Sequence, residues 1–230
     1  MKKKVLITGC AGFIGYSLCN LLLKKKYNIV GIDSLNSYYN LNLKKKRINL
    51  LKSKNFKFIK CDISKKETFF KYIKNYNFNF IIHLAAQPGV RYSFENPQSY
   101  IHNNVDAFAN ILEYTRLKKI DLFYASSSSV YGECKSFPIN ENSILRPNNI
   151  YALTKKHNEE MATLYSKLYK LRIFGLRFFT VYGEWGRPDM LMIKYMLAKL
   201  RKKTFVLDNK GNHFRDFTYI QDVIKILVKL

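Results

Sequence analysis

The chain has 230 residues, of which 47% are hydrophobic, and a formal net charge of +24. This apolar content excludes a largely disordered chain and predicts a sizeable core. The positive charge lies in short lysine runs among abundant Asn, Ile, Tyr and Phe, and no nucleic-acid-binding module accompanies it, so we expect no nucleic-acid partner. Because no apolar stretch approaches the roughly 20 residues of a membrane span, we expect no membrane partner either.

The amino terminus and the cysteines bear on the compartment in which the protein works. The basic start is followed by an apolar run at residues 5–8, which is shorter than the roughly 7 to 15 apolar residues of a secretion signal. The four cysteines are widely spaced, with no Cys-x-x-Cys pair and no His at metal-ligand spacing, so we expect no metal site and no disulfide framework. A reducing cytoplasm fits both features.

Short apolar runs alternate with helical patterns along the first 180 residues. The helical segments carry apolar residues at three- and four-residue intervals, the pattern of helices that cover a sheet. This alternation predicts an α/β fold with a Rossmann-type, doubly wound parallel sheet. The predicted strands are 5–8, 29–32, 56–60, 80–84, 122–126 and 173–178, and the predicted helices are 13–25, 41–51, 65–76, 97–118 and 149–169.

The pattern loosens after residue 178. We predict a helix at 188–200, a strand at 205–207 and a last apolar helix that begins near Ile220. This gives two domains: residues 1–180 as the nucleotide-binding domain, and 181–230 as the start of a substrate-binding region. We expect that region to be incomplete, with its last helix packed on the larger domain.

A glycine-rich turn follows the first predicted strand and opens a helix. Gly9, Gly12 and Gly15 have the spacing Gly-x-x-Gly-x-x-Gly. Glycines allow the tight turn and let backbone N–H groups approach a pyrophosphate, whose charge suits a helix amino end. The strand-turn-helix context favours a dinucleotide site over a plain tight turn.

Two carboxylates close the next strands. Asp33 ends the second strand, where it would accept hydrogen bonds from the adenosine ribose and repel a 2′-phosphate, which favours NAD over NADP. The alternative is that Asp33 only caps the following turn. Asp62 closes the third strand, and contact with adenine and capping of the next helix are equally good interpretations of it.

A possible acid/base pair starts the helix at 149–169. Tyr151 and Lys155 are four residues apart and therefore share one helix face. A free phenol titrates near 10, so a neighbouring ammonium is needed before it can act as a base at neutral pH. The spacing also arises by chance on solvated helices. The run Ser126 to Ser129 follows the fifth strand, at the sheet edge where α/β proteins bind ligands, and so supports the catalytic interpretation over a polar turn.

These motifs together resemble the extended short-chain dehydrogenases/reductases that act on nucleotide sugars. The residues that carry the resemblance are Gly9 to Gly15, 83–87 (His-Leu-Ala-Ala-Gln), 126–132, Tyr151 to Lys155 and 215–220 (Arg-Asp-Phe-Thr-Tyr-Ile). The segments 89–93, 176–183 and 185–190 are most similar to the UDP-glucuronate 4-epimerases.

The resemblance implies an NAD-dependent epimerase that acts on a UDP-sugar and passes through a 4-keto intermediate. It assigns Ser127 as the catalytic hydroxyl, Tyr151 as the base and Lys155 as the residue that positions the nicotinamide ribose. Arg187 is the first candidate for a C6 carboxylate, and Arg91 is the second. The expected cofactor contacts are Gly9, Gly12, Phe13, Ile14, Gly15, Asp33, Asp62, Ile63, Leu84, Ala85, Ala86, Tyr151 and Lys155; the expected substrate contacts are Arg91, Ser127, Ser128, Thr180, Arg187 and Arg215.

Other functions on the same scaffold stay open at this stage. Related 4,6-dehydratases have an acidic pair after the catalytic hydroxyl, where this chain has Ser128 and Ser129, so elimination lacks its acid and base. The chain departs from the family pattern at Pro88 and Ala107, and it ends at Leu230, earlier than the family pattern does. A dehydratase or reductase, or an NAD-binding remnant without turnover, are therefore the alternatives. A homodimer is possible.

Overall fold

A computed structural model describes residues 3–134, 136–212 and 215–230. A six-stranded parallel sheet with the order β3-β2-β1-β4-β5-β6 forms its centre. Because the chain starts in the middle of this sheet and reaches both edges, the sheet is doubly wound, as predicted. The strands are β1 (Lys4–Thr8), β2 (Asn28–Asp33), β3 (Phe56–Lys60), β4 (Phe80–His83), β5 (Asp121–Ser127) and β6 (Ile173–Phe178).

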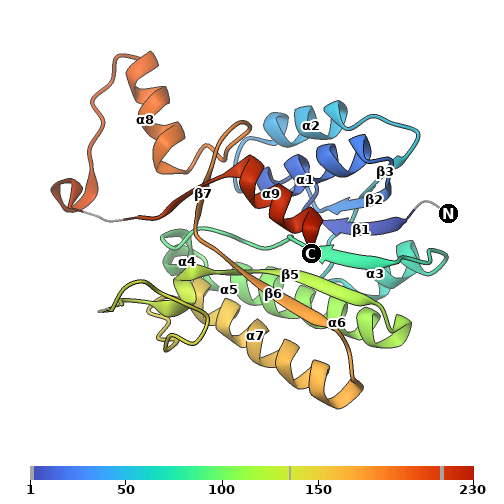
Figure 1. The fold of residues 1–230 in the computed structure, drawn as a ribbon. Coiled ribbons are helices and arrows are strands. Elements are labelled where there is room, and N and C mark those ends of the chain that lie inside the picture. Colours follow the sequence, from blue (N-terminus) through green and yellow to red (C-terminus); the bar gives the residue numbers. More distant parts are fainter. Residues whose placement is uncertain (1–2, 135, 213–214) are drawn as a thin grey trace.

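Helices cover both faces of the sheet (Figure 1). One face packs against α1 (Phe13–Lys24), α2 (Leu41–Leu50) and α9 (Ile220–Lys229), and the other packs against α3 (Lys66–Ile73), α6 (Ala107–Lys118) and α7 (Ile150–Tyr169). Each face has its own apolar core, and the strands between them are buried on both sides, as is usual for parallel sheets. The last helix is held by its buried residues Ile220, Val223 and Ile224, which join the core beneath α1.

Several predicted elements differ from the structure. Residues 205–207 form no strand, because Val206 and Leu207 are exposed and pair with no neighbouring chain. The predicted helix at 65–76 ends at Ile73, and the strand at 80–84 ends at His83. A small parallel sheet of β7 (Thr180–Tyr182) and β8 (Phe217–Tyr219) was not predicted, because its strands are three residues long and pair across 34 residues of intervening chain.

The predicted helix at 97–118 is interrupted by a wide turn. It consists of α5 (Pro97–Tyr100), a π-helical segment (Ile101–Asp106) and α6, and the short α4 (Tyr92–Glu95) precedes it. Asn104 lies in the π segment, and its backbone carbonyl accepts a hydrogen bond from Asn158 Nδ2 at 3.0 Å. The Asn104 side chain binds the backbone N–H of Gln87 at 2.7 Å. These tertiary hydrogen bonds explain the wide turn, since they replace the bonds of a regular helix.

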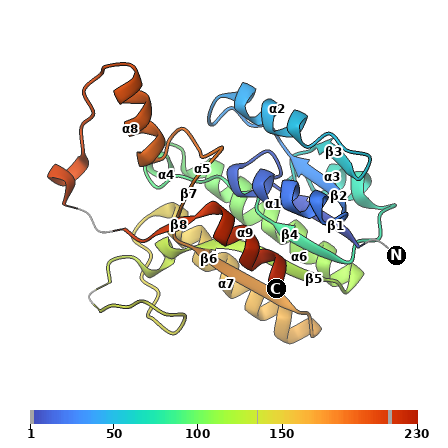
Figure 2. The same cartoon turned by 45° about the horizontal axis from the view of Figure 1, so that its top comes forward.

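Three further elements complete the described chain: a 3₁₀ turn at Ser128–Tyr131, α8 (Leu191–Leu200) and a 3₁₀ turn at Asp208–Gly211. The helix α8 lies apart from the sheet (Figure 2). Among the described residues, no helix combines the length and the apolar character needed to cross a bilayer.

Candidate active site

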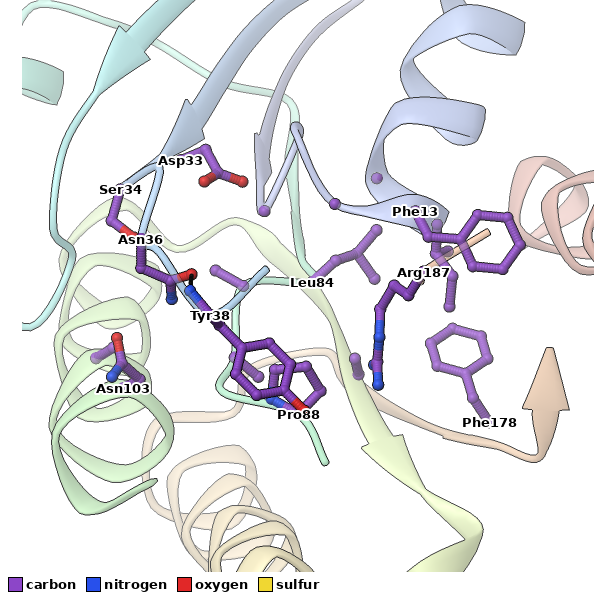
Figure 3. A pocket seen from close by; sticks show the side chains of 18 of the residues that line it. Phe13, Asp33, Ser34, Asn36, Tyr38, Leu84, Pro88, Asn103, Phe178 and Arg187 are labelled. Carbon is purple, nitrogen blue, oxygen red and sulfur yellow. Dashed lines mark hydrogen bonds between the residues drawn. The ribbon is translucent and has the colours of Figure 1, made fainter. Parts of the chain in front are cut away.

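A cavity of about 240 Å³ opens at the carboxyl ends of the six parallel strands. The segments that follow each strand contribute to its wall, because all six strands point the same way and end at one edge of the sheet. Figure 3 shows Asp33 near one end of the cavity, Arg187 and Phe178 near the other, and Tyr38 beside Pro88 between them. Every predicted cofactor residue lines this cavity: Gly9, Gly12, Phe13, Ile14, Gly15, Asp33, Asp62, Ile63, Leu84, Ala85, Ala86, Tyr151 and Lys155.

The glycine turn at the start of α1 leaves no room for side chains. Gly9 has a positive φ of 70°, and a Cβ on it would lie 2.7 Å from the Ala85 backbone nitrogen. A Cβ on Gly15 would collide with the Gly9 carbonyl. Gly12 stands at the N-cap position of α1 without a side-chain hydrogen bond to the helix, so the positive end of the helix faces the cavity.

Asp33 is held by backbone donors at the end of β2. Its carboxylate accepts hydrogen bonds from the N–H groups of Ala11 at 3.1 Å and Leu35 at 2.8 Å. Burial raises the pKa of Asp33, and these hydrogen bonds and the charge of Lys44 oppose that rise. Asp33 therefore caps its own turn and also lines the cavity, so the two interpretations of the sequence are compatible.

Asp62 likewise caps a turn and lines the cavity. Its Oδ1 accepts hydrogen bonds from the backbone N–H and the hydroxyl of Ser64, at 3.1 and 2.6 Å, so it caps the turn that leads into α3. Its Oδ2 lies 3.2 Å from Nε2 of His102. Burial alone would raise the pKa of Asp62, and the hydrogen bonds from Ser64 and His102 outweigh burial, so the pKa is lowered. The carboxylate reaches the cavity wall at the end of β3.

Tyr151 and Lys155 enter the cavity from the first two turns of α7. Asn149 fixes this end of the helix, because its side chain accepts a hydrogen bond from the Ala152 N–H at 2.8 Å. Lys155 is almost fully buried, and its ammonium donates to the Ala125 carbonyl at 2.9 Å. Burial lowers the pKa of Lys155 to about 8, while Glu159 acts in the opposite direction. The ammonium is therefore still charged at neutral pH.

The phenol of Tyr151 lies in a buried site that disfavours its ionised form. Burial raises the pKa of Tyr151, and hydrogen bonding with Ser127 and the positive charge of Arg187 counteract it. Ser127 ends β5, accepts a hydrogen bond from the Ser129 N–H at 3.2 Å and lines the cavity beside Tyr151. The expected Ser, Tyr and Lys group is thus assembled at the edge of the sheet by β5 and α7.

The predicted substrate residues divide into two groups. Arg187 and Ser127 line the cavity, whereas Arg91, Ser128, Thr180 and Arg215 do not. Arg91 precedes α4 and is exposed, Arg215 is exposed near the second sheet, and Ser128 opens the 3₁₀ turn. Thr180 lines a separate apolar cavity of about 30 Å³. Their role as substrate contacts stays a prediction.

The structure adds residues that sequence analysis missed. Asn36, Tyr38, Tyr39 and Lys44 come from the loop after β2 and the start of α2, and all four line the cavity. Lys44 donates to the Asn36 side chain at 2.6 Å. A cluster of Asn and Tyr after the carboxyl end of a strand was the available signal, but only the fold shows that α2 turns this loop over the cavity.

Arg47 connects this loop to the opposite wall. It lies on α2, is fully buried, and donates hydrogen bonds to the Ala11 carbonyl at 2.9 Å and the Tyr39 hydroxyl at 2.8 Å. Its second terminal nitrogen donates to the carbonyls of Trp185 and Gly186, at 2.5 and 3.3 Å. A buried cation that binds four oxygens from three segments fixes those segments relative to one another.

The sheet order, the glycine turn and the Tyr-x-x-x-Lys helix define a nucleotide-binding α/β protein of the short-chain dehydrogenase/reductase class. The match to a family model is consistent with this class and covers residues 5–230. The chain belongs to the NAD dependent epimerase/dehydratase family.

Three comparisons show the similarity at closer range. The chain is 45% identical over 229 residues to Protein CapI of Staphylococcus aureus, covering 99% of this chain and 69% of that protein. It is 41% identical over 227 residues to UDP-glucuronate 4-epimerase 4 of Arabidopsis thaliana, covering 96% of this chain and 52% of the plant protein. The structure of UDP-glucuronic acid 4-epimerase from Bacillus cereus, in complex with UDP-glucuronic acid and NAD, superposes with a TM-score of 0.92 at 38% identity and covers 98% of this chain and 72% of that one.

Proposed function

We propose that this protein is an NAD-dependent nucleotide-sugar 4-epimerase that interconverts UDP-glucuronate and UDP-galacturonate. The observation that carries the proposal is that Ser127, Tyr151, Lys155 and Arg187 line the same cavity as the glycine turn. The similarity to UDP-glucuronate 4-epimerases supports the choice of sugar. A dehydratase is less well supported, because Ser128 and Ser129 follow the catalytic hydroxyl where an acid pair would be needed.

The residues that line the cavity suit NAD. At the glycine turn, the backbone of Gly9 and Gly15 is bare where a Cβ would collide with its neighbours, and the uncapped amino end of α1 suits a pyrophosphate. Asp33 would accept hydrogen bonds from the adenosine ribose, with Asp62 and Ile63 near the adenine. Leu84, Ala85 and Ala86 would flank the nicotinamide half, and Lys155 would hold its ribose.

The protein residues supply proton transfer and orientation. When bound, NAD would supply the redox chemistry, as the acceptor of a hydride from C4 of the hexose and the donor of that hydride to the other face. Tyr151 removes the proton from O4 and later gives it back, and Ser127 hydrogen-bonds the same oxygen. Because burial raises the pKa of Tyr151, the phenolate needs nearby positive charge, and Arg187 provides part of it.

Arg187 is the proposed selector of a uronate over a neutral hexose. A guanidinium can bind a carboxylate through two parallel hydrogen bonds, which a hydroxymethyl group cannot match. Arg91, Ser128, Thr180 and Arg215 are proposed as further substrate contacts. They would have to reach the sugar nucleotide from outside the cavity wall.

The direct test is to incubate the purified protein with NAD and either UDP-glucuronate or UDP-galacturonate, and to resolve the two C4 epimers. We expect both reactions to approach the same epimer ratio, since an epimerase catalyses both directions. UDP-glucose in a parallel reaction should be converted much more slowly. A product that has lost water or carbon dioxide, or no conversion from either side, would contradict the proposal.

We also propose a cytoplasmic location and a homodimer. All four cysteines are free, which suits a reducing compartment. Leu153, Leu164 and Leu168 are more than half exposed and form one stripe on α7, a surface that a second copy could cover. Light scattering of the parent and of a Leu164→Glu variant would test the dimer: the variant should be monomeric.

A further inference from the structure

We propose that Tyr38 and Asp189 are positioning residues that hold Arg187 in the orientation that selects an acidic sugar. This inference rests on the proposed function and adds two residues to its specificity machinery. Tyr38 belongs to the loop after β2, and Asp189 belongs to the loop between β7 and α8. We call the group of Tyr38, Asp189 and Arg187 the arginine latch.

The latch begins with a two-point ion pair. Arg187 Nε donates to Asp189 Oδ1 at 3.0 Å, and Arg187 Nη2 donates to Asp189 Oδ2 at 2.6 Å. The two parallel bonds fix the plane of the guanidinium as well as its position. They engage one edge of the group and not Nη1. Arg187 lines the cavity, whereas the Asp189 carboxylate that binds it does not.

Tyr38 is the third member of the latch and, like Arg187, lines the cavity. Its hydroxyl donates to Asp189 Oδ2 at 3.2 Å. The ring packs against Tyr92 with 5.1 Å between centroids, and its hydroxyl occupies the space that a Cβ on Gly89 would need. Tyr38 therefore touches loops that follow β4 and β7 while it belongs to the loop that follows β2. In Figure 3 the side chains of Tyr38 and Arg187 face the same cavity.

The charges of the latch suit a fixed orientation. The side chains of Arg187 and Asp189 are only 24% and 27% exposed, so their attraction is weakly screened. Burial alone would raise the pKa of Asp189, but the hydrogen bonds and charge of Arg187, helped by Tyr38, lower it. Asp189 is therefore ionised at neutral pH. An arginine without this support could take several rotamers, and a carboxylate ligand would have to order it on binding.

The latch predicts a change in selectivity that general damage to the fold would not produce. The measured quantity is the ratio of the UDP-glucose dissociation constant to the UDP-glucuronate dissociation constant, determined by calorimetry on NAD-loaded protein. We expect Tyr38→Phe to lower this ratio by about threefold and Asp189→Asn by about tenfold, the size of effect expected for hydrogen bonds to charged groups. In an Arg187→Ala background, Asp189→Asn should lower the ratio no further, because Asp189 acts only through Arg187.

A second trio in the chain provides a matched control. Tyr165 donates to Glu113 at 2.6 Å, and Arg116 Nη2 donates to the same carboxylate at 2.8 Å. None of the three residues lines the cavity. Tyr165→Phe and Glu113→Gln make the same chemical changes as the latch variants. They should leave the ratio of dissociation constants within twofold of the parent.

Urea unfolding supplies a readout that needs no sugar. The stability changes of Tyr38→Phe and Arg187→Ala should each be non-additive with that of Asp189→Asn, since the three side chains interact directly. If the parent binds both sugars but the latch variants keep or increase its ratio, the latch is wrong while the proposed function stands. If the parent binds neither sugar, the proposed function fails, and additive stability changes would then overturn the latch as well.

Discussion

Helices α1 and α8 are both strongly apolar, yet only α1 has buried residues. Seven of the 12 residues of α1 are buried, because the helix starts at the glycine turn, packs on the sheet and contacts α9 beside it. None of the ten residues of α8 is buried, and the helix projects from the sheet (Figure 2). An apolar repeat therefore predicts a helix in both places, but the partner surface alone decides whether that helix contributes to a core.

The same contrast runs through the cavity. Its cofactor end is built from glycine backbone and strand ends that the sheet fixes. The end of the cavity near Arg187, where we propose that the sugar binds, depends on loop 183–190, which is held by single side chains such as Arg47 and Tyr38. We therefore expect the largest effects from substitutions of residues that the sheet and its covering helices fix, such as Tyr151 and Leu18.

The largest effect should come from Tyr151→Phe. This change removes only the ionisable oxygen, so we expect kcat to fall by about 10³-fold while the NAD dissociation constant stays within twofold. Arg187→Ala, at the sugar end, should act mainly on KM for UDP-glucuronate. Steady-state kinetics and calorimetry on the two variants would check both statements. Turnover of Tyr151→Phe within a few-fold of the parent would remove Tyr151 as the base.

Matched leucine truncations test the two helices directly. Leu18→Ala in α1 removes a fully buried side chain and should lower the free energy of unfolding by about 2 to 5 kcal/mol. Leu200→Ala at the end of α8 truncates a side chain that is 79% exposed and should change it by less than about 0.5 kcal/mol. Urea denaturation gives both values. Similar losses of unfolding free energy in the two variants would show that α8 contributes to a core as α1 does, against our expectation.

Lys155 should make stability depend on pH. Burial lowers its pKa to about 8 in the folded protein, whereas an unfolded lysine titrates near 10.4. Between these values the unfolded chain binds more protons, so this lysine makes the free energy of unfolding rise with pH, and its charged form costs stability at neutral pH. At pH 7, Lys155→Met should raise the free energy of unfolding by at most about 3 kcal/mol. The loss of the hydrogen bond to the Ala125 carbonyl reduces this gain.

The control for Lys155→Met is the same pair of proteins at high pH. The charge-dependent part of the difference in unfolding free energy between variant and parent should shrink above pH 8 and be nearly gone by about pH 11, because the parent lysine is then largely neutral in both states. Equal differences at pH 7 and pH 10.4 would show that packing, not charge, causes the change.

The smallest effect concerns the choice of cofactor. A 2′-phosphate beside the Asp33 carboxylate would be repelled in this buried site, so the parent should bind NAD more tightly than NADP. Asp33→Asn should reduce that preference by about tenfold, mainly through tighter NADP binding. Dissociation constants at one ionic strength measure the effect. If the parent binds the two cofactors equally, Asp33 does not select between them.

Much of the fold and the cofactor site could be predicted from local patterns. The spacing of Gly9, Gly12 and Gly15 predicts a tight turn without side chains, and the structure confirms it. The alternation of strands and helices predicts the parallel sheet, which the structure also confirms. The family prediction is also confirmed. Residues 205–207 show the limit of this approach, because a run of suitable residues forms no strand without a neighbour to pair with.

The tertiary structure alone decided which distant side chains meet. Asn104 widens its helix because Gln87 and Asn158 bind it from two other segments, which no local pattern records. Tyr38 and Asp189 are 151 residues apart and meet only because the loops after β2 and β7 converge over one edge of the sheet. The local sequence determines the backbone conformation of a segment and the spacing of its buried residues. Contacts between side chains of different loops depend on where the sheet places those loops, which no single segment encodes.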